Sequence, residues 1–335
     1  MIGSIFYSKK FNLHRPSEYH PENPKRLEIV LSKVRELGLE ERIEEPNPVE
    51  ETFVEKIHDR DYINFVKEAV EKGITRLDPD TYVSPGTWSA ALLALGAARS
   101  AALSALHYGG LHMALVRPPG HHAGRRGRAM GAPTLGFCIF NNAASAVVTL
   151  KEEGVGKVVV IDFDAHHGNG TQEIFWNDPD VIHIDLHERD IYPGSGDVSE
   201  VGGSNAYGSK INLPMPHYSG DGDYIYVWDE IVLPIVEEVK PKVIVISAGF
   251  DGFKGDGLTT LRLTESFYSY AGATLNKYPL AFILEGGYGV GLDKGFPAFI
   301  MGYEEGKAKA REEPRYETLK LAEEVKDILS PWWSL

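Results

Sequence analysis

Residues 157–170 have the sequence KVVVIDFDAHHGNG. The β-branched run at 157–161 predicts a buried strand. Two carboxylates and two imidazoles follow it at once, and residues 162, 164 and 166 share one side of the chain if it stays extended. Asp164 and His166 can therefore bind one metal ion, because a carboxylate oxygen and an imidazole nitrogen suit zinc. The alternative is a polar loop whose side chains are all hydrogen-bonded.

The composition bounds the class of protein. The chain has 335 residues, is 43% hydrophobic and carries a formal net charge of -14. It is long enough for one large α/β domain. Its acidity argues against direct nucleic-acid binding, which draws affinity from Lys and Arg on phosphates. Acidity suits cationic substrates such as lysine-rich proteins or polyamines through weak steering, although it serves solubility equally well.

Several features bear on where the protein works. Cys138 is the only cysteine in the sequence, which excludes an intrachain disulfide and fits a reducing compartment. Residues 1–8 predict a first strand and lack the apolar run of a signal peptide. Residues 88–106 are mainly Ala and Leu but contain Arg99, which predicts a buried helix rather than a membrane span. We therefore expect a cytoplasmic protein without membrane contact.

Strands and helices alternate along the rest of the chain. Apolar, β-branched runs predict strands at residues 112–116, 157–161, 181–185, 242–247 and 280–284. Amphipathic patterns predict helices at residues 24–37, 59–72, 85–106, 142–153, 223–239, 264–276 and 292–303. This alternation predicts a mostly parallel sheet with helices on both faces. The charged C-terminus predicts a surface helix, which Trp332 and Trp333 either pack onto the body or offer to another subunit.

Reactive side chains cluster directly after four of these strands. The stretch RPPGHH (117–122) follows the first strand, the Asp-His segment the second, AGFD (248–251) the fourth and EGGYG (285–289) the fifth. Binding sites of open α/β sheets form beyond the carboxyl ends of the strands. The four clusters are therefore expected to converge on one crevice.

Asp251 is the predicted third metal ligand. With Asp164 and His166 it makes a set of two carboxylates and one imidazole, which leaves an open position for water and substrate, as in catalytic zinc sites. The two negative charges balance a dication, so the metal keeps its Lewis acidity. Taken alone, Asp251 is equally well a turn former or a helix cap, because Gly252 follows it.

His121 and His122 form a tandem pair on a loop that two preceding prolines stiffen. Adjacent histidines can serve as base and acid in amide hydrolysis if each has an orienting partner. Asp162 and Asn169 flank the metal segment and can each accept an Nδ1–H; an aspartate raises the basicity of its histidine more than an asparagine does. Two differently tuned imidazoles suit a mechanism that takes a proton and later returns it. The alternative is a surface pair that binds metal as an affinity tag does.

Three aromatic residues near the proposed crevice give weaker signals. Tyr288 follows two glycines at a strand end, where a phenol can donate a hydrogen bond to a developing oxyanion. Phe137, which follows Gly136, and Tyr192 each place a ring near the crevice and can wall a narrow apolar slot. Ordinary core packing explains each of these aromatics equally well.

These stretches resemble those of the histone deacetylase superfamily, which includes acetylpolyamine amidohydrolases and acetoin-utilisation proteins. The resemblance covers about residues 14–305 and rests on HPENPKR (20–26), RPPGHHA (117–123), GFC (136–138), DFDAHHGNG (162–170), PGSG (193–196), SAGFD (247–251) and EGGY (285–288). Asn169 and the EGGY stretch resemble the class II branch. The resemblance implies the arginase–deacetylase fold, a single three-layer α/β domain over residues 1–335 with a charged helical extension at 306–335.

The resemblance also implies a role for each matched residue. The implied zinc ligands are Asp164, His166 and Asp251. The implied catalytic group is His121 and His122, with Asp162 and Asn169 behind them and Tyr288 as the oxyanion donor. The implied wall of an active-site tunnel is Gly136, Phe137 and Tyr192.

Two structural potassium sites are implied as well. The first lies near the metal and uses the carbonyls of Asp162, Asp164 and His166, with Asp185 and Leu186 close by. The second uses the carbonyls of Phe175, Asp178 and Val181.

The chain departs from the family pattern at three places. Residues 123–135 form a longer loop than is usual in class II, and its three arginines, at the tunnel mouth, would disfavour highly cationic tails or contact another subunit: Arg125, Arg126 and Arg128. Leu258 stands where polyamine-specific relatives have an acidic gatekeeper, which argues against a polyamine, although Glu18 is a second candidate for the mouth. Asp185 stands where Ser is frequent, and its carboxylate favours a bound cation.

The implied activity is removal of an acetyl or other short acyl group from an acylated amine. A zinc ion and Tyr288 would polarise the amide carbonyl, with His122 as the base toward the attacking water. The expected substrate is acetyl-lysine in a peptide, or alternatively an acetylpolyamine or another small acetylated amine. Iron or manganese can occupy the same ligands. The sequence is compatible with a homo-oligomer.

Two other functions deserve comparison. A ureohydrolase with two manganese ions would need a further Asp two residues from Asp251, but positions 249 and 253 are Gly and Phe. A non-catalytic module that binds metal or acyl-lysine would lack the tyrosine or a histidine, but Tyr288, His121 and His122 are all present. The residues therefore favour an enzyme with one catalytic metal ion.

Overall fold

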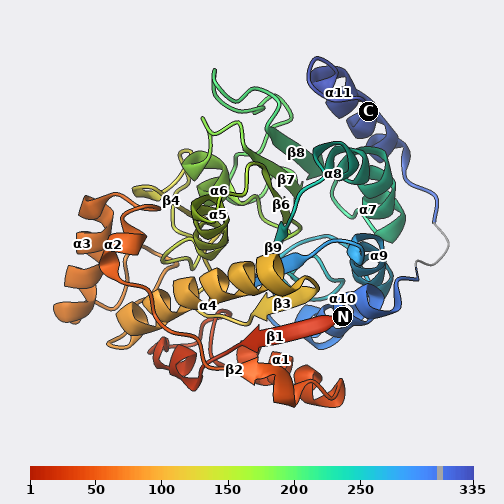
Figure 1. Ribbon diagram of the computed structural model, residues 1–335. Coiled ribbons are helices and arrows are strands. Elements are labelled where there is room, and N and C mark those ends of the chain that lie inside the picture. Colours follow the sequence, from red (N-terminus) through yellow and green to blue (C-terminus); the bar gives the residue numbers. More distant parts are fainter. Residues whose placement is uncertain (308–311) are drawn as a thin grey trace.

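The computed structural model describes residues 1–307 and 312–335. Its central sheet contains the strands β1 (Ile2–Phe6), β2 (Ile43–Glu44), β3 (Leu111–Ala114), β6 (Val158–Asp162), β7 (Val181–Glu188), β8 (Lys210–Met215), β9 (Ile244–Ala248) and β10 (Leu280–Leu284). The order across the sheet is β2-β1-β3-β10-β9-β6-β7-β8 (Figure 1). Each of these neighbouring pairs is parallel, which confirms the predicted α/β class.

The predicted strands lie within a few residues of the observed ones, but the sequence patterns missed β8 and the two-residue β2. Strand β8 has the sequence KINLPM, in which Lys210 and Asn212 are both buried. Two polar residues and a proline interrupt the apolar run by which a buried strand is normally found. The polar positions of β8 therefore concealed it.

One face of the sheet is covered by α4 (Thr87–Tyr108) and α5 (Asn142–Glu152). Helix α4 packs on β1, β3 and β10, and α5 packs on β6 and β9. Among the described residues, α4 alone is long and apolar enough for a membrane span, and 61% of its apolar window is buried within the protein. Its position against α5 and the sheet agrees with the buried helix that the sequence predicts.

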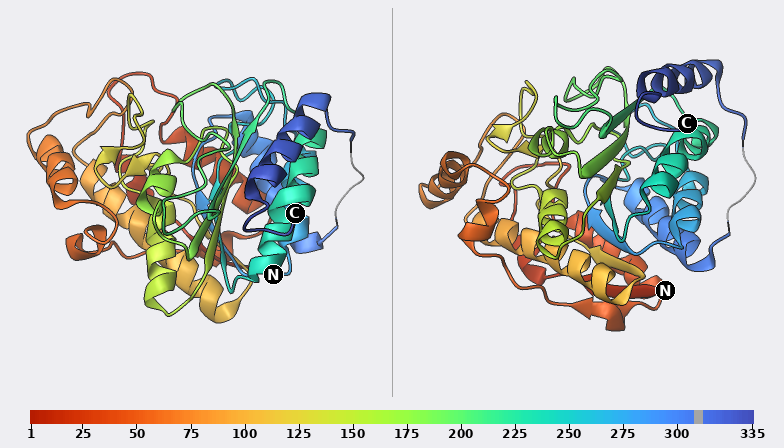
Figure 2. Two further views of the ribbon diagram at one scale, coloured as in Figure 1. Left: turned by 90° about the horizontal axis from the view of Figure 1, so that it is seen from above. Right: turned by 45° about the horizontal axis from the view of Figure 1, so that its top comes forward.

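The opposite face carries one N-terminal helix and the helices of the C-terminal half of the chain, as Figure 2 shows in two further views. These helices are α1 (Lys25–Glu36), α7 (Asp221–Val227), α8 (Leu233–Val239), α9 (Glu265–Leu275), α10 (Phe296–Glu305) and α11 (Tyr316–Leu329). Two predicted helices contain a π-helical turn, at Trp228–Val232 and Gly291–Gly295. Pro234 and Pro297 follow these turns closely, and a proline lacks the N–H that a regular α-helical turn would use.

The remaining described elements are the 3-10 helices at Lys9–Leu13 and Glu40–Arg42, the helices α2 (Glu51–Val54), α3 (Arg60–Glu71) and α6 (Asn169–Ile174), and a small antiparallel hairpin of β4 (Ala123–Gly124) and β5 (Gly127–Arg128). Helix α6 begins within the Asp-His segment, and the hairpin follows the tandem histidines. These short elements thus frame the edge of the sheet where the sequence predicts the site.

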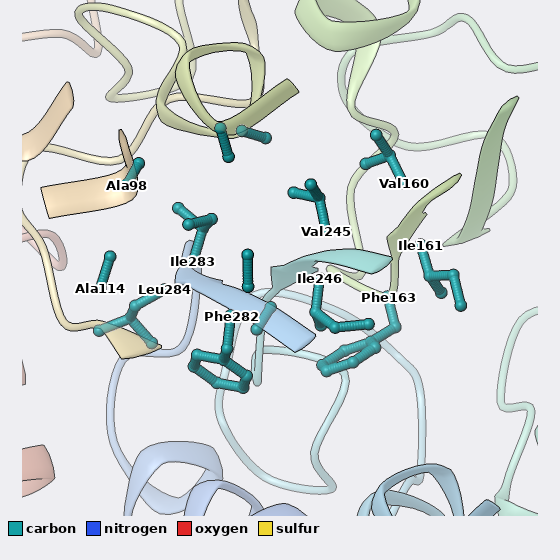
Figure 3. Packing of buried hydrophobic residues seen from close by; sticks show 14 of the residues in the cluster. Ala98, Ala114, Val160, Ile161, Phe163, Val245, Ile246, Phe282, Ile283 and Leu284 are labelled. Atoms are coloured by element: carbon teal, nitrogen blue, oxygen red, sulfur yellow. The ribbon is translucent and has the colours of Figure 1, made fainter. Parts of the chain in front are cut away.

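The core consists of strand side chains that alternate between the two helical layers (Figure 3). Phe282 of β10 packs on Phe299 of α10, with ring centroids 5.5 Å apart, and Phe163 lies 5.7 Å from the same ring. Ile283 and Val245 point to the other side, as the period of two along a strand requires. This packing holds the carboxyl ends of the central strands in fixed positions.

The C-terminal segment packs against the body. Helix α11 lies on β8, and Arg315 before it donates from Nε to Asp223 Oδ2 over 3.0 Å. Trp333 Nε1 donates to the Gly208 carbonyl over 2.7 Å, whereas Trp332 is 40% exposed. Trp333 thus packs the extension down, the first of the two alternatives above. Residues 308–311 of the predicted extension lie outside the described residues.

Candidate active site

The four predicted clusters and Tyr192 follow five strands that are adjacent in the sheet. The order β3-β10-β9-β6-β7 lines up their carboxyl ends, which lead into His121, Tyr288, Asp251, Asp164 and Tyr192 respectively. Register pairs Asp162 of β6 with Ser247 of β9 and with Asp185 of β7. Segments as far apart as His121 and Tyr288, 167 residues, are therefore brought to one edge by the topology alone, which is where α/β sheets bind ligands.

Asp164, His166 and Asp251 form a compact group of three candidate metal ligands. One ligand atom from each lies within 4.8 Å of the others. His166 Nδ1 is 2.9 Å from Asp251 Oδ2 and 3.2 Å from Asp164 Oδ1. The backbone N–H of Ala165 donates to Asp251 Oδ1 over 2.9 Å, which fixes the carboxylate, as hydrogen bonds around metal ligands do.

Two glycines let the backbone approach this group closely. A Cβ added at Gly249 would lie 2.0 Å from Asp164 Oδ2, and one at Gly286 would lie 2.4 Å from the same oxygen. The N–H of Gly286 donates to that oxygen over 2.8 Å. A side chain at either position would displace the ligand, so glycine is required here by space and not by backbone angle.

The charge of the group matches a divalent cation. Asp164 and Asp251 are each only 1% exposed. Burial raises the pKa of Asp251, and the neighbouring Asp164 raises it further, because two carboxylates at close range repel each other where water is excluded. A dication between the two carboxylates and the imidazole would relieve that repulsion. The residues present thus fit a metal ion with mixed oxygen and nitrogen ligands.

The tandem histidines each have the partner that the sequence predicts. His121 Nδ1 is 2.9 Å from Asp162 Oδ2, and His122 Nδ1 is 2.8 Å from Asn169 Oδ1. The two rings are 4.0 Å apart, and both are nearly fully buried. Each imidazole is therefore held at Nδ1, which leaves its Nε2 available for proton transfer.

The surroundings of the two histidines shift their pKa values in opposite directions. Burial lowers the pKa of His122 well below its ordinary value, and the neighbouring His121 and His166 lower it further. Burial acts on His121 as well, but the charges of Asp162 and Asp164 outweigh it and raise the pKa of His121. One imidazole is thus set to be neutral and the other to be protonated, in the protein without its metal.

Tyr288 lies on the loop that follows β10. Its backbone N–H donates to Asp256 Oδ2 over 2.7 Å, and the Arg26 guanidinium lies 5.0 Å from the centre of its ring. Burial, opposed by Arg26, raises the pKa of the Tyr288 phenol well above its ordinary value. The hydroxyl therefore stays protonated and able to donate a hydrogen bond.

The three predicted wall residues lie beside the tandem histidines and Tyr288. The rings of His122 and Tyr192 make an edge contact at 4.9 Å, and those of Phe137 and Tyr288 make one at 5.9 Å. A Cβ at Gly136 would lie 2.5 Å from His122 Cδ2 and 2.7 Å from the Tyr192 hydroxyl. Gly136 thus allows both rings to close on the chain at this point.

The residues predicted at the mouth lie farther out. Leu258 is 43% exposed, on the loop whose Thr259 donates to the Asp251 carbonyl over 3.1 Å. Glu18 is exposed and pairs with Arg76 at 3.3 Å. In the arginine loop, Arg126 pairs with Asp59 next to α3 at 3.2 Å. This contact directs Arg126 toward α3.

A second buried group of ligand type lies behind the histidine pair. Asp162, His183 and Asp185 offer ligand atoms within 4.8 Å of one another, and all three are buried. Asp185 accepts from His187 Nδ1 over 2.6 Å and from Gly168 N–H over 2.8 Å. In the part of the chain that the structure describes, neither ring nitrogen of His183 has a hydrogen-bond partner. Buried polar atoms without partners are uncommon and call for an ion or a water.

Sequence reasoning missed the residues that support the site from behind. Glu285 is fully buried, and its Oε2 accepts from the N–H groups of Gly120 and His121 over 2.8 and 3.2 Å. Arg26 donates from Nε to the Gly287 carbonyl over 2.6 Å and to the Glu285 carbonyl. Both residues belong to the matched stretches HPENPKR and EGGY, so the motif itself was the available signal, whereas their burial was not visible.

Comparison with known proteins gives the class to which this fold and site belong. The family model for the histone deacetylase domain matches residues 20–297. The chain is 38% identical to a probable deacetylase of Archaeoglobus fulgidus over 302 residues, covering 87% of this chain and 82% of that protein. The crystal structure of the HDA15 HD domain superimposes with a TM-score of 0.87 at 30% identity, covering 98% of this chain and 96% of the other.

The chain therefore belongs to the histone deacetylase family and is a hydrolase of the deacetylase class. An uncharacterized protein of Methanocaldococcus jannaschii is 48% identical to it over 309 residues, with 92% of this chain and 89% of that protein covered. The arginase–deacetylase fold implied by the sequence motifs is the fold observed.

Proposed function

We propose that this enzyme uses Zn²⁺, held by Asp164, His166 and Asp251, to hydrolyse the amide of an acetylated or short-chain acylated amine such as acetyl-lysine. The observation that carries the proposal is the pair His121–His122, with one partner an aspartate and the other an asparagine, directly beside the three-ligand group. A protein that only binds its ligand does not need two adjacent imidazoles whose pKa values are shifted in opposite directions.

The ligand set favours zinc. A divalent ion there would polarise the substrate carbonyl and lower the pKa of a bound water. Two carboxylates and one imidazole leave a position open, which catalytic zinc sites need. Iron or manganese can use the same ligands, so metal availability decides among them.

His122 is the proposed base. Asn169 Nδ2 donates to the Ala129 carbonyl over 2.9 Å, so its Oδ1 faces His122 and accepts the Nδ1–H. The lone pair of His122 then lies on Nε2 and can take a proton from the attacking water. His121, whose Asp162 partner favours the imidazolium, returns a proton to the leaving amine.

Tyr288 is the proposed hydrogen-bond donor to the oxyanion. Its phenol stays protonated, and the loop that carries it is fixed by Asp256 on one side and Arg26 on the other. A donor held in place before the reaction stabilises developing charge without reorganisation.

The proposed substrate side chain enters between Phe137 and Tyr192. These rings lie next to Tyr288 and His122 respectively, so an extended aliphatic stem between them would carry its acyl group to the catalytic side chains. Leu258 at the rim offers no charge to a polyamine, which favours acetyl-lysine in a peptide over an acetylpolyamine.

We also propose a structural K⁺ at the first of the two implied sites, formed by the carbonyls of Asp162, Asp164 and His166 with Asp185 and Leu186. The buried carboxylates of Asp162 and Asp185, with His183 Nε2 at 3.6 Å from Asp185 Oδ2, support a bound cation there. Burial and Asp185 raise the pKa of Asp162 to about 8, against the influence of His121, which marks a local excess of negative charge.

The test is hydrolysis by the zinc-loaded protein of an acetyl-lysine peptide, an acetylpolyamine and a small acetylated amine, each with and without a chelator. Acetate release from the peptide that the chelator abolishes is the expected result. Acetate release from the acetylpolyamine instead would support the same hydrolytic mechanism but identify polyamines as the substrate class. Binding of the peptide without release from any substrate would overturn the proposal in favour of a binding module.

A matched pair of variants tests the base. His122→Ala should lose about 10³-fold in kcat, in the range of general-base catalysis. His107→Ala, an exposed histidine near the end of α4, should keep full activity. Full activity in His122→Ala would exclude His122 as the base.

A further inference from the structure

Lys210 is a buried lysine at the start of β8. Its relative exposure is 0%, although lysines are almost never fully buried unless they are paired. Its Nζ donates to Ser209 Oγ over 2.6 Å, to the Val181 carbonyl over 2.8 Å and to the Asp178 carbonyl over 3.2 Å. The Ser209 carbonyl lies at 3.5 Å. The ammonium group is thus surrounded by neutral oxygen atoms.

Two of these oxygens belong to the second potassium site that the family resemblance implies. That site requires the carbonyls of Phe175, Asp178 and Val181. The carbonyls of Asp178 and Val181 are taken by Lys210 Nζ, and the Phe175 carbonyl accepts the N–H of Asp178 over 3.0 Å. A potassium ion at the same carbonyls would lie next to a positive charge in a region without water. The residues present therefore do not fit potassium at this position.

The ammonium group of Lys210 contacts neutral oxygen atoms, as a bound metal ion would. The Asp178 carboxylate forms its ion pair with Lys151 of α5, so the ammonium is left with carbonyl and hydroxyl dipoles. Burial lowers the pKa of Lys210 to about 7. The negative charge of Asp178 acts in the opposite direction, because it favours the charged form of the lysine.

We infer that Lys210 Nζ is a built-in cation that replaces the second potassium ion of the fold. It ties β8 to the loop between α6 and β7, and therefore to the segments that carry Asn169 and Asp185. This position needs no exchangeable ion. Only the first implied cation site, around Asp162 and Asp185, remains open to potassium.

The experiment compares thermal unfolding of the full chain in potassium chloride and in tetramethylammonium chloride at matched ionic strength, at about pH 6, where the lysine is charged. Lys210→Ser removes the ammonium and opens space at the carbonyls. It should lose roughly 5 °C in Tm in tetramethylammonium and regain at least half of that loss in potassium. Lys210→Met fills the space without charge and should show the loss without the regain.

Lys151→Met is the matched control. Lys151 contacts the same aspartate, but through its carboxylate and not its carbonyl. This variant should respond to potassium as the wild type does, since both keep the first cation site unchanged. A Lys210→Ser protein whose response to potassium equals that of the wild type would overturn the inference.

Rubidium in crystals gives a direct answer that does not depend on the stability of any variant. Wild-type crystals soaked in rubidium chloride should show no anomalous peak at the carbonyls of Asp178 and Val181, and Lys210→Ser crystals should show one there. A rubidium peak at these carbonyls in the wild type, with the lysine displaced, would disprove the built-in cation outright. Neither measurement uses deacetylase activity, so failure here leaves the proposed function untouched.

Discussion

Two buried groups of charged side chains behave differently in this protein. In the first, Glu22 is held by Arg26 at 3.2 Å and by Arg117, and all three are at most 1% exposed. In the second, Asp164 and Asp251 have only His166 between them. The chain supplies its own cations to Glu22 and leaves the aspartates without an arginine or lysine partner among the described contacts. The missing charge marks the place for a metal ion, whose open coordination position an arginine could not provide.

The two groups are connected through Arg26. The same guanidinium that pairs with Glu22 donates to the Gly287 and Glu285 carbonyls, and so holds the loop of Tyr288. Arg117 and His14, together with burial, determine the ionisation of Glu22: burial alone would raise its pKa, but these neighbours keep it well below its ordinary value. The first group thus gives a fixed frame, and the second is the proposed site of an exchangeable ion.

Removal of the metal should have the largest effect, and only on the second group. With a chelator, activity should fall by about 10⁴-fold, because the Lewis acid is worth several kcal/mol. Stability should fall by about 4 kcal/mol relative to protein with metal at a thousandfold excess over Kd. Assays and urea unfolding with and without chelator measure both. If the enzyme kept its activity after complete removal of metal, Asp164 and Asp251 would not form a catalytic metal site and the proposed difference between the two groups would be wrong.

Glu22→Gln should have the next largest effect, on stability and without regard to metal. It leaves two buried arginines short of their counter-charge, which costs about 3–5 kcal/mol. Urea unfolding measures the loss in metal-loaded and metal-free protein alike. Glu18→Gln, four residues earlier and exposed, is the control and should change stability by less than about 0.5 kcal/mol. If Glu22→Gln lowered the free energy of unfolding only with metal bound, the two groups would be energetically coupled rather than independent.

Tyr288→Phe should lower the activity of the enzyme without changing its stability. Loss of a single oxyanion donor costs about 10²–10³-fold in kcat. Arg26 still holds the Gly287 carbonyl, so the free energy of unfolding should stay within about 0.5 kcal/mol of the wild type. Steady-state kinetics and urea unfolding on one preparation check both statements. A variant with normal kcat would remove Tyr288 from the mechanism.

The last prediction concerns His58, a buried histidine that stays neutral. It differs from the two groups above because it avoids a buried charge altogether. His58 Nδ1 donates to the Gly124 carbonyl over 2.8 Å, and Nε2 accepts the Asn141 N–H over 3.0 Å. Burial lowers its pKa from 6.5 to about 4. The unfolded chain therefore binds the proton first, and stability is lost as pH falls from about 6.5 to about 4, by about 3 kcal/mol.

Unfolding by urea across that pH range measures the effect. His58→Gln should flatten this part of the profile, whereas His107→Gln, on an exposed histidine, should leave it unchanged. Equal slopes in the wild type and His58→Gln would show that His58 is not held neutral.

The parts of the site that could be predicted are those encoded locally. Asp164 and His166 follow a β-branched strand by two and four residues, and the rule that chemistry gathers at carboxyl ends of strands extends the set to Asp251 and Tyr288. The alternating strands and helices likewise gave the parallel sheet. In each case spacing along the chain carries the information.

The remaining features depend on pairings over long distances. Arg117 and Glu22 are 95 residues apart, and nothing in the spacing of either shows that both are buried. The burial of Lys210 could not be predicted either. A lysine within an apolar run argues against a buried strand, and two of its oxygen partners, the carbonyls of Asp178 and Val181, lie far away along the chain. Polar groups that are satisfied by distant partners are the ones that sequence patterns cannot place.

The close approach of Gly249 to Asp164 limits the evolutionary routes open to this chain. A second metal ion, as in binuclear ureohydrolases, needs an added aspartate at position 249 or 253. The first position has no room for a Cβ, and the second holds Phe253, stacked on Tyr268 at 6.1 Å inside an aromatic cluster. Neither change is reachable by one substitution that keeps the first metal site and the core intact. A second metal ion would therefore require several coordinated substitutions around position 249 or 253.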